Sequence, residues 1–166
     1  MNDSVVGQIV ARHAEGYKVD IGSAVAAQLD HLAFEGANRK NKPNLQVGHL
    51  VYARVSFANK FTEPEIACFH PTTGKSAGFG LLEGGTMITV SLGVARYLLR
   101  PECELLLLLS HHLKYEVAIG MNGRVWINAE SIKAAIVVSR CIESFNDSKS
   151  TDVSGLVRSI VKQVGP

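Results

Sequence analysis

The sequence has few cysteines, no long apolar run and no large excess of one charge. Its three cysteines, Cys68, Cys103 and Cys141, lie far apart, are odd in number and form no C-x-x-C pair. This spacing argues against a disulfide framework or a zinc site and favours reduced, buried thiols. The longest apolar run, residues 105–109, is too short to cross a bilayer. With a formal net charge of only +2, any site for a polyanion must depend on local clustering of cations.

Motifs for catalysis are incomplete in this sequence. Residues 73–76, T-G-K-S, end like a phosphate-binding loop, but Phe69 stands where that motif requires its first glycine. His111 and His112 are adjacent, so they diverge on a helix and cannot share a metal ion. Neighbouring acids are more typical of solvated surface than of a metal-dependent nuclease; they are Glu63 with Glu65 and Glu102 with Glu104. We therefore expect no enzyme activity, no cofactor, no metal site and no small-molecule substrate.

Residues 1–72 are predicted to form an all-β domain. Apolar residues alternate with polar ones in short runs that are separated by Gly, Asn and Pro. The predicted strands lie near residues 5–13, 17–21, 26–34, 47–57 and 65–69. Five short strands in about 70 residues predict a small closed barrel, for which the OB-fold is the common solution.

Alternation also assigns side chains of this barrel to its two faces. The residues expected inside are Tyr17, Val19, Ile21, Val51, Ala53 and Val55. Lys18 should point outward, and Tyr52 and Arg54 should lie together on the outer face. An aromatic ring beside a guanidinium suits single-stranded nucleic acid, because bases stack on the ring and the cation meets phosphate. An ordinary half-buried surface aromatic is the alternative for Tyr52.

Positive charge is concentrated between residues 36 and 62, which contain no Asp or Glu and have a local charge of +5. The cations of this window are Arg39, Lys40, Lys42, Arg54 and Lys60. Residues 36–45 are predicted to be a loop, since they are rich in Asn, Gly and Pro. Cations on a loop of an OB-like barrel favour phosphate contacts, although a solvated loop would explain the same residues.

Residues 73–166 are predicted to form an α+β domain of the KH type with an additional C-terminal helix. Residues 70–85 are predicted to be a linker. After them, the pattern predicts a strand, two helices, two strands and a long helix. In the long helix, which should begin at Ser131, the predicted apolar stripe consists of Ile132, Ala135, Ile136, Ser139, Ile142 and Phe145. Residues 146–155 are polar and are expected to be a loose connection to the last helix.

Residues 114–128 predict a β-hairpin, because two alternating runs flank Gly120, Met121, Asn122 and Gly123. Asn and Gly tolerate positive φ, so we expect a primed turn. KH domains clamp the nucleic-acid backbone with a Gly-x-x-Gly loop between their first two helices. Here that connection, residues 100–102, has no glycine pair. We therefore expect that the clamp is missing, that RNA contacts the barrel instead, and that Gly120, Asn122, Gly123 and Trp126 serve packing.

Four segments together resemble the S1–KH cap subunit of the eukaryotic RNA exosome. They are G-Y-K-V-D-I-G (16–22), N-L-Q-V-G-H-L-V-Y-A-R-V (44–55), T-G-K-S-A-G-F-G (73–80) and G-M-N-G-R-V-W (120–126). The resemblance implies an S1-type barrel followed by a KH domain. It implies a non-catalytic subunit that sits on the six-subunit ring and contacts ring and other cap subunits. Such a subunit helps form the entrance pore and guides single-stranded RNA to nuclease subunits for 3'–5' processing and degradation, including that of rRNA. It also implies residence in nucleus, nucleolus and cytoplasm, with no membrane partner.

The resemblance also bears on individual residues. His31 falls where S1 domains commonly have a histidine on the third strand, with a partly buried barrel histidine as the alternative. Lys18 stands where S1 domains often have an aromatic, which weakens a stacking platform on the second strand. The RNA-binding candidates are Lys18, His31, Arg39, Lys40, Lys42, Tyr52 and Arg54. The family has a small β-rich domain before the barrel, and we expect that domain to be absent from this chain. The alternative function is a structural adaptor that holds exosome subunits together, with residues 39–42 paired to acidic side chains of neighbouring subunits.

Overall fold

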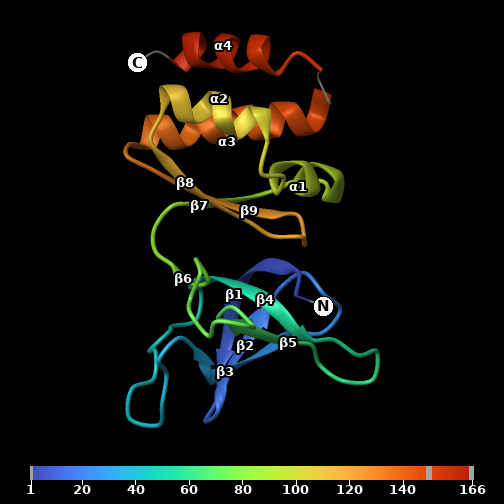
Figure 1. Ribbon diagram of the computed structural model, residues 1–166, viewed down its shortest axis with the longest axis vertical. Coiled ribbons are helices and arrows are strands. Elements are labelled where there is room, and N and C mark those ends of the chain that lie inside the picture. Colours follow the sequence, from blue (N-terminus) through green and yellow to red (C-terminus); the bar gives the residue numbers. More distant parts are fainter. Residues whose placement is uncertain (1, 149–150, 165–166) are drawn as a thin grey trace. The chain divides into compact units, whose positions relative to one another are not determined.

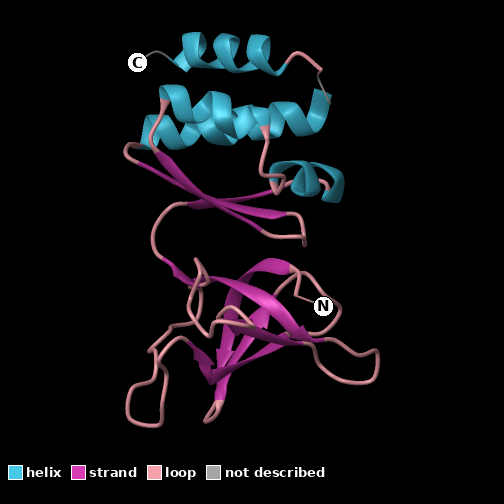
Figure 2. Ribbon diagram, viewed as in Figure 1, coloured by secondary structure: helices cyan, strands magenta, loops and turns pink. Residues whose placement is uncertain are grey.

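The computed structural model describes residues 2–148 and 151–164. The chain divides into two compact units between Glu83 and Gly84. Figure 2 shows their different composition: the first unit consists of strands and loops, whereas the second combines a sheet with helices.

The first unit is a closed β-barrel. Its strands are β1 (Ser4–Arg12), β2 (Gly16–Asp20), β3 (Ala27–Phe34), β4 (Leu50–Phe57), β5 (Glu65–Cys68) and β6 (Gly80–Leu82). They are hydrogen-bonded in the order β1-β2-β3-β5-β4-β6, and β1 also pairs with β4, which closes the first five strands into a barrel (Figure 1). The β3–β5 pair is parallel and the other pairs are antiparallel. This arrangement confirms the OB-type barrel predicted from the sequence.

The barrel interior follows the predicted alternation. Tyr17, Val19, Val51 and Ala53 have no exposed side-chain area, Ile21 is buried, and Val55 packs against the same core. Burial of one such aliphatic or aromatic side chain stabilises the fold by about 1.5–3 kcal/mol. A one-residue shift of register would turn this whole set toward solvent, so the core fixes which side chains the outer face presents.

The segment predicted to be a linker instead contributes a strand to the barrel. Gly80–Leu82 pairs antiparallel with β4, and the side chains of Phe79 and Leu81 pack against the barrel core. The first unit therefore extends to Glu83, beyond the predicted division between residues 72 and 73. Periodicity did not reveal β6, because a strand of three residues is too short to show alternation.

The second unit has the order strand, helix, helix, strand, strand, helix that the sequence predicted, followed by one more helix. Its elements are β7 (Thr86–Thr89), α1 (Leu92–Leu98), α2 (Glu104–His112), β8 (Tyr115–Ile119), β9 (Arg124–Ala129), α3 (Ile132–Ser148) and α4 (Val153–Val164). The sheet order is β7-β9-β8, with both pairs antiparallel. Helices α2 and α3 cover one face of this sheet, and α4 packs against them (Figure 1). The predicted KH-type topology is confirmed.

Two details of these helices differ from the prediction. The buried stripe of α3 is formed by Ala134, Val137, Val138, Cys141 and Ile142, whereas Ile132 is 82% exposed and Ile136 41% exposed. The predicted stripe was therefore correct at Ile142, which is buried, and at Phe145, which packs against the core. It was wrong at Ile132 and Ile136, because two overlapping sets of apolar residues share the sequence of this helix. In addition, α3 continues to Ser148 and α4 begins at Val153, so helix occupies both ends of the connection predicted at 146–155.

Candidate nucleic-acid interface

The hairpin turn at residues 120–123 has a packing role. Gly123 N donates to Gly120 O at 3.1 Å, and Gly123 has φ +79° whereas Asn122 does not adopt positive φ. The predicted primed turn is therefore wrong: the hairpin uses an ordinary turn that ends in a left-handed glycine. Val90 N donates to Gly123 O at 2.7 Å, and a Cβ at position 123 would lie 2.6 Å from Val90 O.

Other contacts of the KH-type unit agree with this role. The indole Nε1 of Trp126 donates to Gly84 O at 2.8 Å, and the Trp126 side chain is buried. Helix α1 ends at Leu98 and α2 begins at Glu104, and no glycine lies between them. The described part of this unit thus lacks a Gly-x-x-Gly clamp between its first two helices, as predicted.

The tip of the β3–β4 loop is a tight, ordered turn. The Asn38 side-chain oxygen accepts from the backbone N–H groups of Lys40 at 2.9 Å and Asn41 at 2.8 Å. Backbone hydrogen bonds of 3.1 Å link Asn38 and Asn41 in both directions. An Asn side chain commonly closes a turn in this way. As a result, Arg39 and Lys40 project into solvent from a defined backbone.

The returning arm of this loop is anchored to the barrel core. The buried Tyr17 donates its hydroxyl hydrogen to Pro43 O at 2.7 Å, and the Tyr17 hydroxyl oxygen accepts from Leu45 N at 3.1 Å. Lys42 precedes these anchors and is exposed. Arg39, Lys40 and Lys42 form no ion pair with any residue that the structure describes, so their charges are not compensated within the unit.

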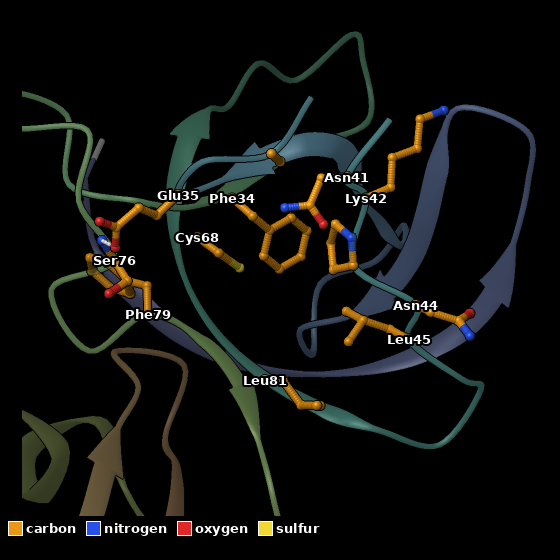
Figure 3. A pocket seen from close by; sticks show the side chains of 12 residues that line it. Phe34, Glu35, Asn41, Lys42, Asn44, Leu45, Cys68, Ser76, Phe79 and Leu81 are labelled. Atoms are coloured by element: carbon orange, nitrogen blue, oxygen red, sulfur yellow. Dashed lines mark hydrogen bonds between the residues drawn. The ribbon is translucent and has the colours of Figure 1, made fainter. Parts of the chain in front are cut away.

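A hollow of about 510 Å³ lies at the base of this loop (Figure 3). Its lining residues are Phe34, Glu35, Ala37, Asn41, Lys42, Pro43, Asn44, Leu45, Cys68, Ser76, Phe79 and Leu81. Figure 3 shows the ring of Phe34 inside the hollow, whereas the Lys42 side chain extends away from it. A concavity lined by both apolar and polar side chains, with cations nearby, can hold a base while phosphates stay at the rim.

One carboxylate fixes the edge of this hollow. The Glu35 Oε2 atom accepts from the backbone N–H of Ser76 at 2.7 Å. This hydrogen bond, with a smaller contribution from nearby Lys75, holds the pKa of Glu35 below its ordinary value. Glu35 therefore ties the segment before β6 to the end of β3, and it is the negative charge that an RNA strand would have to avoid.

Lys18 has a partner within the chain. Its Nζ lies 2.9 Å from Glu63 Oε1, and Gln28 Nε2 donates to the other oxygen of the same carboxylate. The hydrogen bond from Lys18, followed by that from Gln28, lowers the pKa of Glu63. Lys18 points outward as predicted, but its charge is compensated; its contact with RNA stays a prediction.

Arg54 is not the exposed cation that the sequence predicted. Its side chain is only 7% exposed. Nε donates to Phe69 O at 2.7 Å and Nη1 to Asn2 Oδ1 at 3.1 Å, and the guanidinium lies 5.0 Å from the Phe69 ring centroid. Alternation placed Arg54 correctly outside the barrel core, but chain segments from both ends of the unit cover it, so Arg54 stabilises their packing.

Tyr52 and His31 are both partly buried. The Tyr52 ring lies 5.1 Å from that of Phe79, which gives it an aromatic neighbour on the barrel rather than the exposed guanidinium that was expected. The His31 ring meets Tyr17 edge-on at 4.8 Å, and its Nδ1 is shielded from solvent with no hydrogen-bond partner among the described residues. Contacts of Tyr52 and His31 with RNA stay predictions.

Sequence reasoning missed a group of exposed aromatics on the β4–β5 loop. Phe57 is 40% exposed and Phe61 80% exposed, and the Lys60 Nζ lies 4.9 Å from the Phe61 ring centroid. The signal was present in the sequence as F-A-N-K-F, where aromatics flank a cation in a predicted loop. Lys60 was counted as charge, but its aromatic neighbours were not considered.

The structure also bears on other chemistry. Cys68, Cys103 and Cys141 are free and buried, as expected, and burial raises the pKa of Cys68 to about 12. In residues 2–148 and 151–164, no three His, Cys, Asp or Glu side chains are grouped as metal ligands. No helix in these ranges has the length and apolar character needed to span a membrane.

Two family models match the chain, one for each unit. The model described as "Exosome complex component RRP40, S1 domain" matches residues 1–80, and a model described as "KH domain" matches residues 85–133. A solved crystal structure of a protein assigned as an exosome complex RNA-binding protein has a TM-score of 0.74 at 22% identity and covers 98% of this chain and 91% of that one. At this identity the match supports the fold alone.

Whole-sequence relatives carry the same name. Exosome complex component rrp40 of Schizosaccharomyces pombe is 53% identical over 144 residues, which cover 86% of this chain and 60% of the relative. The Saccharomyces cerevisiae protein of that name is 45% identical with the same coverage, and the human one is 37% identical, with 86% of this chain and 52% of the relative covered. The chain spans about 60% of the length of the first two of these relatives. Over 86% of its length the chain is similar to these exosome components, and its two units match an S1-domain model and a KH-domain model.

Proposed function

We propose that this chain is a non-catalytic, RNA-binding cap component of an RNA exosome. It would bind single-stranded RNA at the entrance pore, contact ring and other cap subunits, and guide RNA toward nuclease subunits for 3'–5' processing and degradation. We further propose that it works in nucleus, nucleolus and cytoplasm. The observation that carries the proposal is the ordered β3–β4 loop, where Arg39, Lys40 and Lys42 are exposed beside a hollow of mixed apolar and polar lining on an S1-type barrel.

The proposed mechanism is electrostatic capture with little readout of sequence. Three exposed cations on a tip held by Asn38 would meet successive phosphates. Bases would bind in the hollow at the base of the loop, where the ring of Phe34 lies (Figure 3). Ion release from phosphates makes such binding strongly dependent on salt, with a slope of about −0.7 per phosphate contact for single strands.

A structural adaptor is the second candidate, and one observation favours it. Arg54 is buried and Lys18 is paired with Glu63, so only three of the five predicted cationic contacts are exposed without an internal partner. In this alternative the same loop would pair with acidic side chains of a neighbouring exosome subunit. Reversal of the loop charges would then impair assembly and leave any affinity for RNA unchanged.

The test is a titration of fluorescein-labelled single-stranded RNA at about 50 mM and about 200 mM salt. It compares wild type with the triple variant Arg39→Glu, Lys40→Glu, Lys42→Glu. The expected result is weaker binding by the variant and a log–log salt slope shallower by about 2, since about 0.7 is lost for each phosphate contact.

A matched control keeps the change in net charge the same. It carries Lys133→Glu, Arg158→Glu and Lys162→Glu, all at exposed positions of α3 and α4, and it should bind RNA nearly as wild type does. Equal loss in both triple variants would show a general charge effect rather than a site on the loop. A wild type that binds no RNA at either salt concentration would leave the adaptor as the supported function.

A further inference from the structure

The β4–β5 loop of the barrel presents aromatic side chains to solvent in a fixed setting. Phe61 is 80% exposed and Phe57 at the end of β4 is 40% exposed. Lys60 lies between them in sequence, and its ammonium group is 4.9 Å from the Phe61 ring centroid. Aromatic rings that alternate with cations on an exposed loop are typical of surfaces on which single-stranded bases stack.

The base of this loop is tied to the barrel. Gln28 N donates to Pro64 O at 2.8 Å, and the Glu63 carboxylate is held by Lys18 at 2.9 Å and by the Gln28 side chain. Near the tip, Phe61 N donates to the Asn59 side-chain oxygen at 2.9 Å. The exposed ring is therefore presented by a backbone that is already ordered, which reduces the conformational entropy lost on binding.

The charges around the loop favour an anionic partner, such as a nucleic acid, over a basic or neutral one. Residues 57–62 contain Lys60 and no carboxylate. The acid that follows, Glu63, is compensated by Lys18, so the next acid along the chain is Glu65 at the start of β5. The Lys60 ammonium can meet a phosphate while the exposed ring of Phe61 receives the attached base.

We propose that Phe61, with Lys60 and Phe57, is a base-stacking site for single-stranded RNA, separate from the β3–β4 loop. The inference rests on the proposed RNA-binding function and adds a second contact point to it. In the view of Figure 1 the β3–β4 and β4–β5 loops extend from different sides of the barrel. An OB-type barrel covers roughly 4–16 nucleotides, so one strand can contact the cations of the first loop and the aromatics of the second.

The experiment is a binding titration of the full chain with a fluorescein-labelled oligouridine. Phe61→Ala is expected to lower the affinity about tenfold, which lies within the range measured for loss of one base–aromatic stack. The salt slope should stay unchanged, because no charge is removed. Phe61→Tyr should retain the affinity of wild type, because it keeps the aromatic ring. Phe61→Leu, which keeps apolar bulk without a π-face, should lose affinity as Phe61→Ala does.

A second probe reports stacking directly. An oligouridine with one 2-aminopurine should lose fluorescence on binding to wild type, and this quenching should be reduced for Phe61→Leu. The matched control is Ile132→Ala, since Ile132 on α3 is exposed to the same degree, at 82%. That variant should bind and quench as wild type does.

The outcomes separate the inference from the function on which it rests. Binding that is lost in the Arg39/Lys40/Lys42→Glu variant but unchanged in Phe61→Ala would overturn the stacking site and leave the proposed function in place. Absence of RNA binding by wild type would overturn both. If Phe61→Ala keeps full RNA affinity but no longer joins purified exosome subunits, Phe61 is an anchor for a protein neighbour and the inference fails.

Discussion

At the scale of single residues, glycines that combine left-handed backbone with close packing should be the least replaceable. Gly123 has φ +79°, and a side chain there would lie 2.6 Å from Val90 O. Gly84 has a similar φ of +68° but open space around it. The two positions lie in the same unit, so together they separate backbone strain from steric conflict.

We expect Gly123→Ala to lower the free energy of unfolding of the KH-type unit by about 2–4 kcal/mol, since backbone strain of about 1–3 kcal/mol is joined by a clash with Val90 O, just after β7. Gly84→Ala should lower it by only about 1 kcal/mol, for strain alone. Urea unfolding of both variants measures the difference. Equal losses would mean that the contact with Val90 relaxes without a penalty and that φ alone restricts position 123.

Single residues also show where sequence reasoning reached its limit. Alternation correctly placed Arg54 outside the barrel core, but it carries no information on what covers an outer face. Phe69 and Asn2, which cover Arg54, are distant from it in sequence. No sequence pattern predicts that they contact Arg54. The exposure of the loop cations was easier to predict, because Arg39, Lys40 and Lys42 lie in a stretch whose Asn, Gly and Pro content indicates a loop.

At the scale of elements, the segment before β6 depends on one carboxylate. Glu35 at the end of β3 accepts from Ser76 N, and its pKa is held below the ordinary value of 4.5. A carboxyl group with a lowered folded-state pKa contributes stability above its unfolded pKa, and this contribution is lost as the pH falls through the folded value. The attachment of this segment should therefore weaken only below about pH 4.5.

The Ser76 amide resonance reports this attachment by NMR. It should titrate with a midpoint below 4.5 in wild type and show no such titration in Glu35→Gln. The Val94 amide, which donates to the neutral hydroxyl of Ser91 at 3.3 Å, serves as an internal control and should not follow the same curve. A Ser76 midpoint at or above 4.5 would contradict the charge-assisted hydrogen bond.

Elements were predictable where their pattern was long or their ends were marked. Ser91, a residue type that favours helix starts, caps α1, with Val94 N donating to its hydroxyl, and the strands of the barrel core alternate over many residues. Strand β6 was not predictable, since three residues give no period and its position depends on pairing with β4 and on packing of Leu81 against the barrel core. The face of α3 was partly mistaken because helical periodicity fitted two stripes, and only the tertiary partners of Val137, Val138 and Cys141 select between them.

At the scale of the whole molecule, the two units have separate hydrophobic cores. The barrel core includes Leu29, which is 1% exposed, and the core of the KH-type unit includes Leu105, which is fully buried. The two clusters have no residue in common. Removal of a buried leucine side chain costs about 2–5 kcal/mol through lost burial and the cavity left behind. We therefore expect each unit to respond to its own core.

Leu29→Ala should lower the hydrogen-exchange protection of amides in the barrel and leave the slowest amides of α2 and α3 protected, and Leu105→Ala should do the reverse. Because the proposed RNA contacts belong to the barrel, Leu29→Ala should also weaken RNA binding near the temperature at which the barrel opens, whereas Leu105→Ala should not. Native-state hydrogen exchange and an RNA titration at the same temperatures measure both effects. Loss of protection across both units in either variant would instead show that they fold as one cooperative body, and RNA binding could then not be assigned to the barrel by this means.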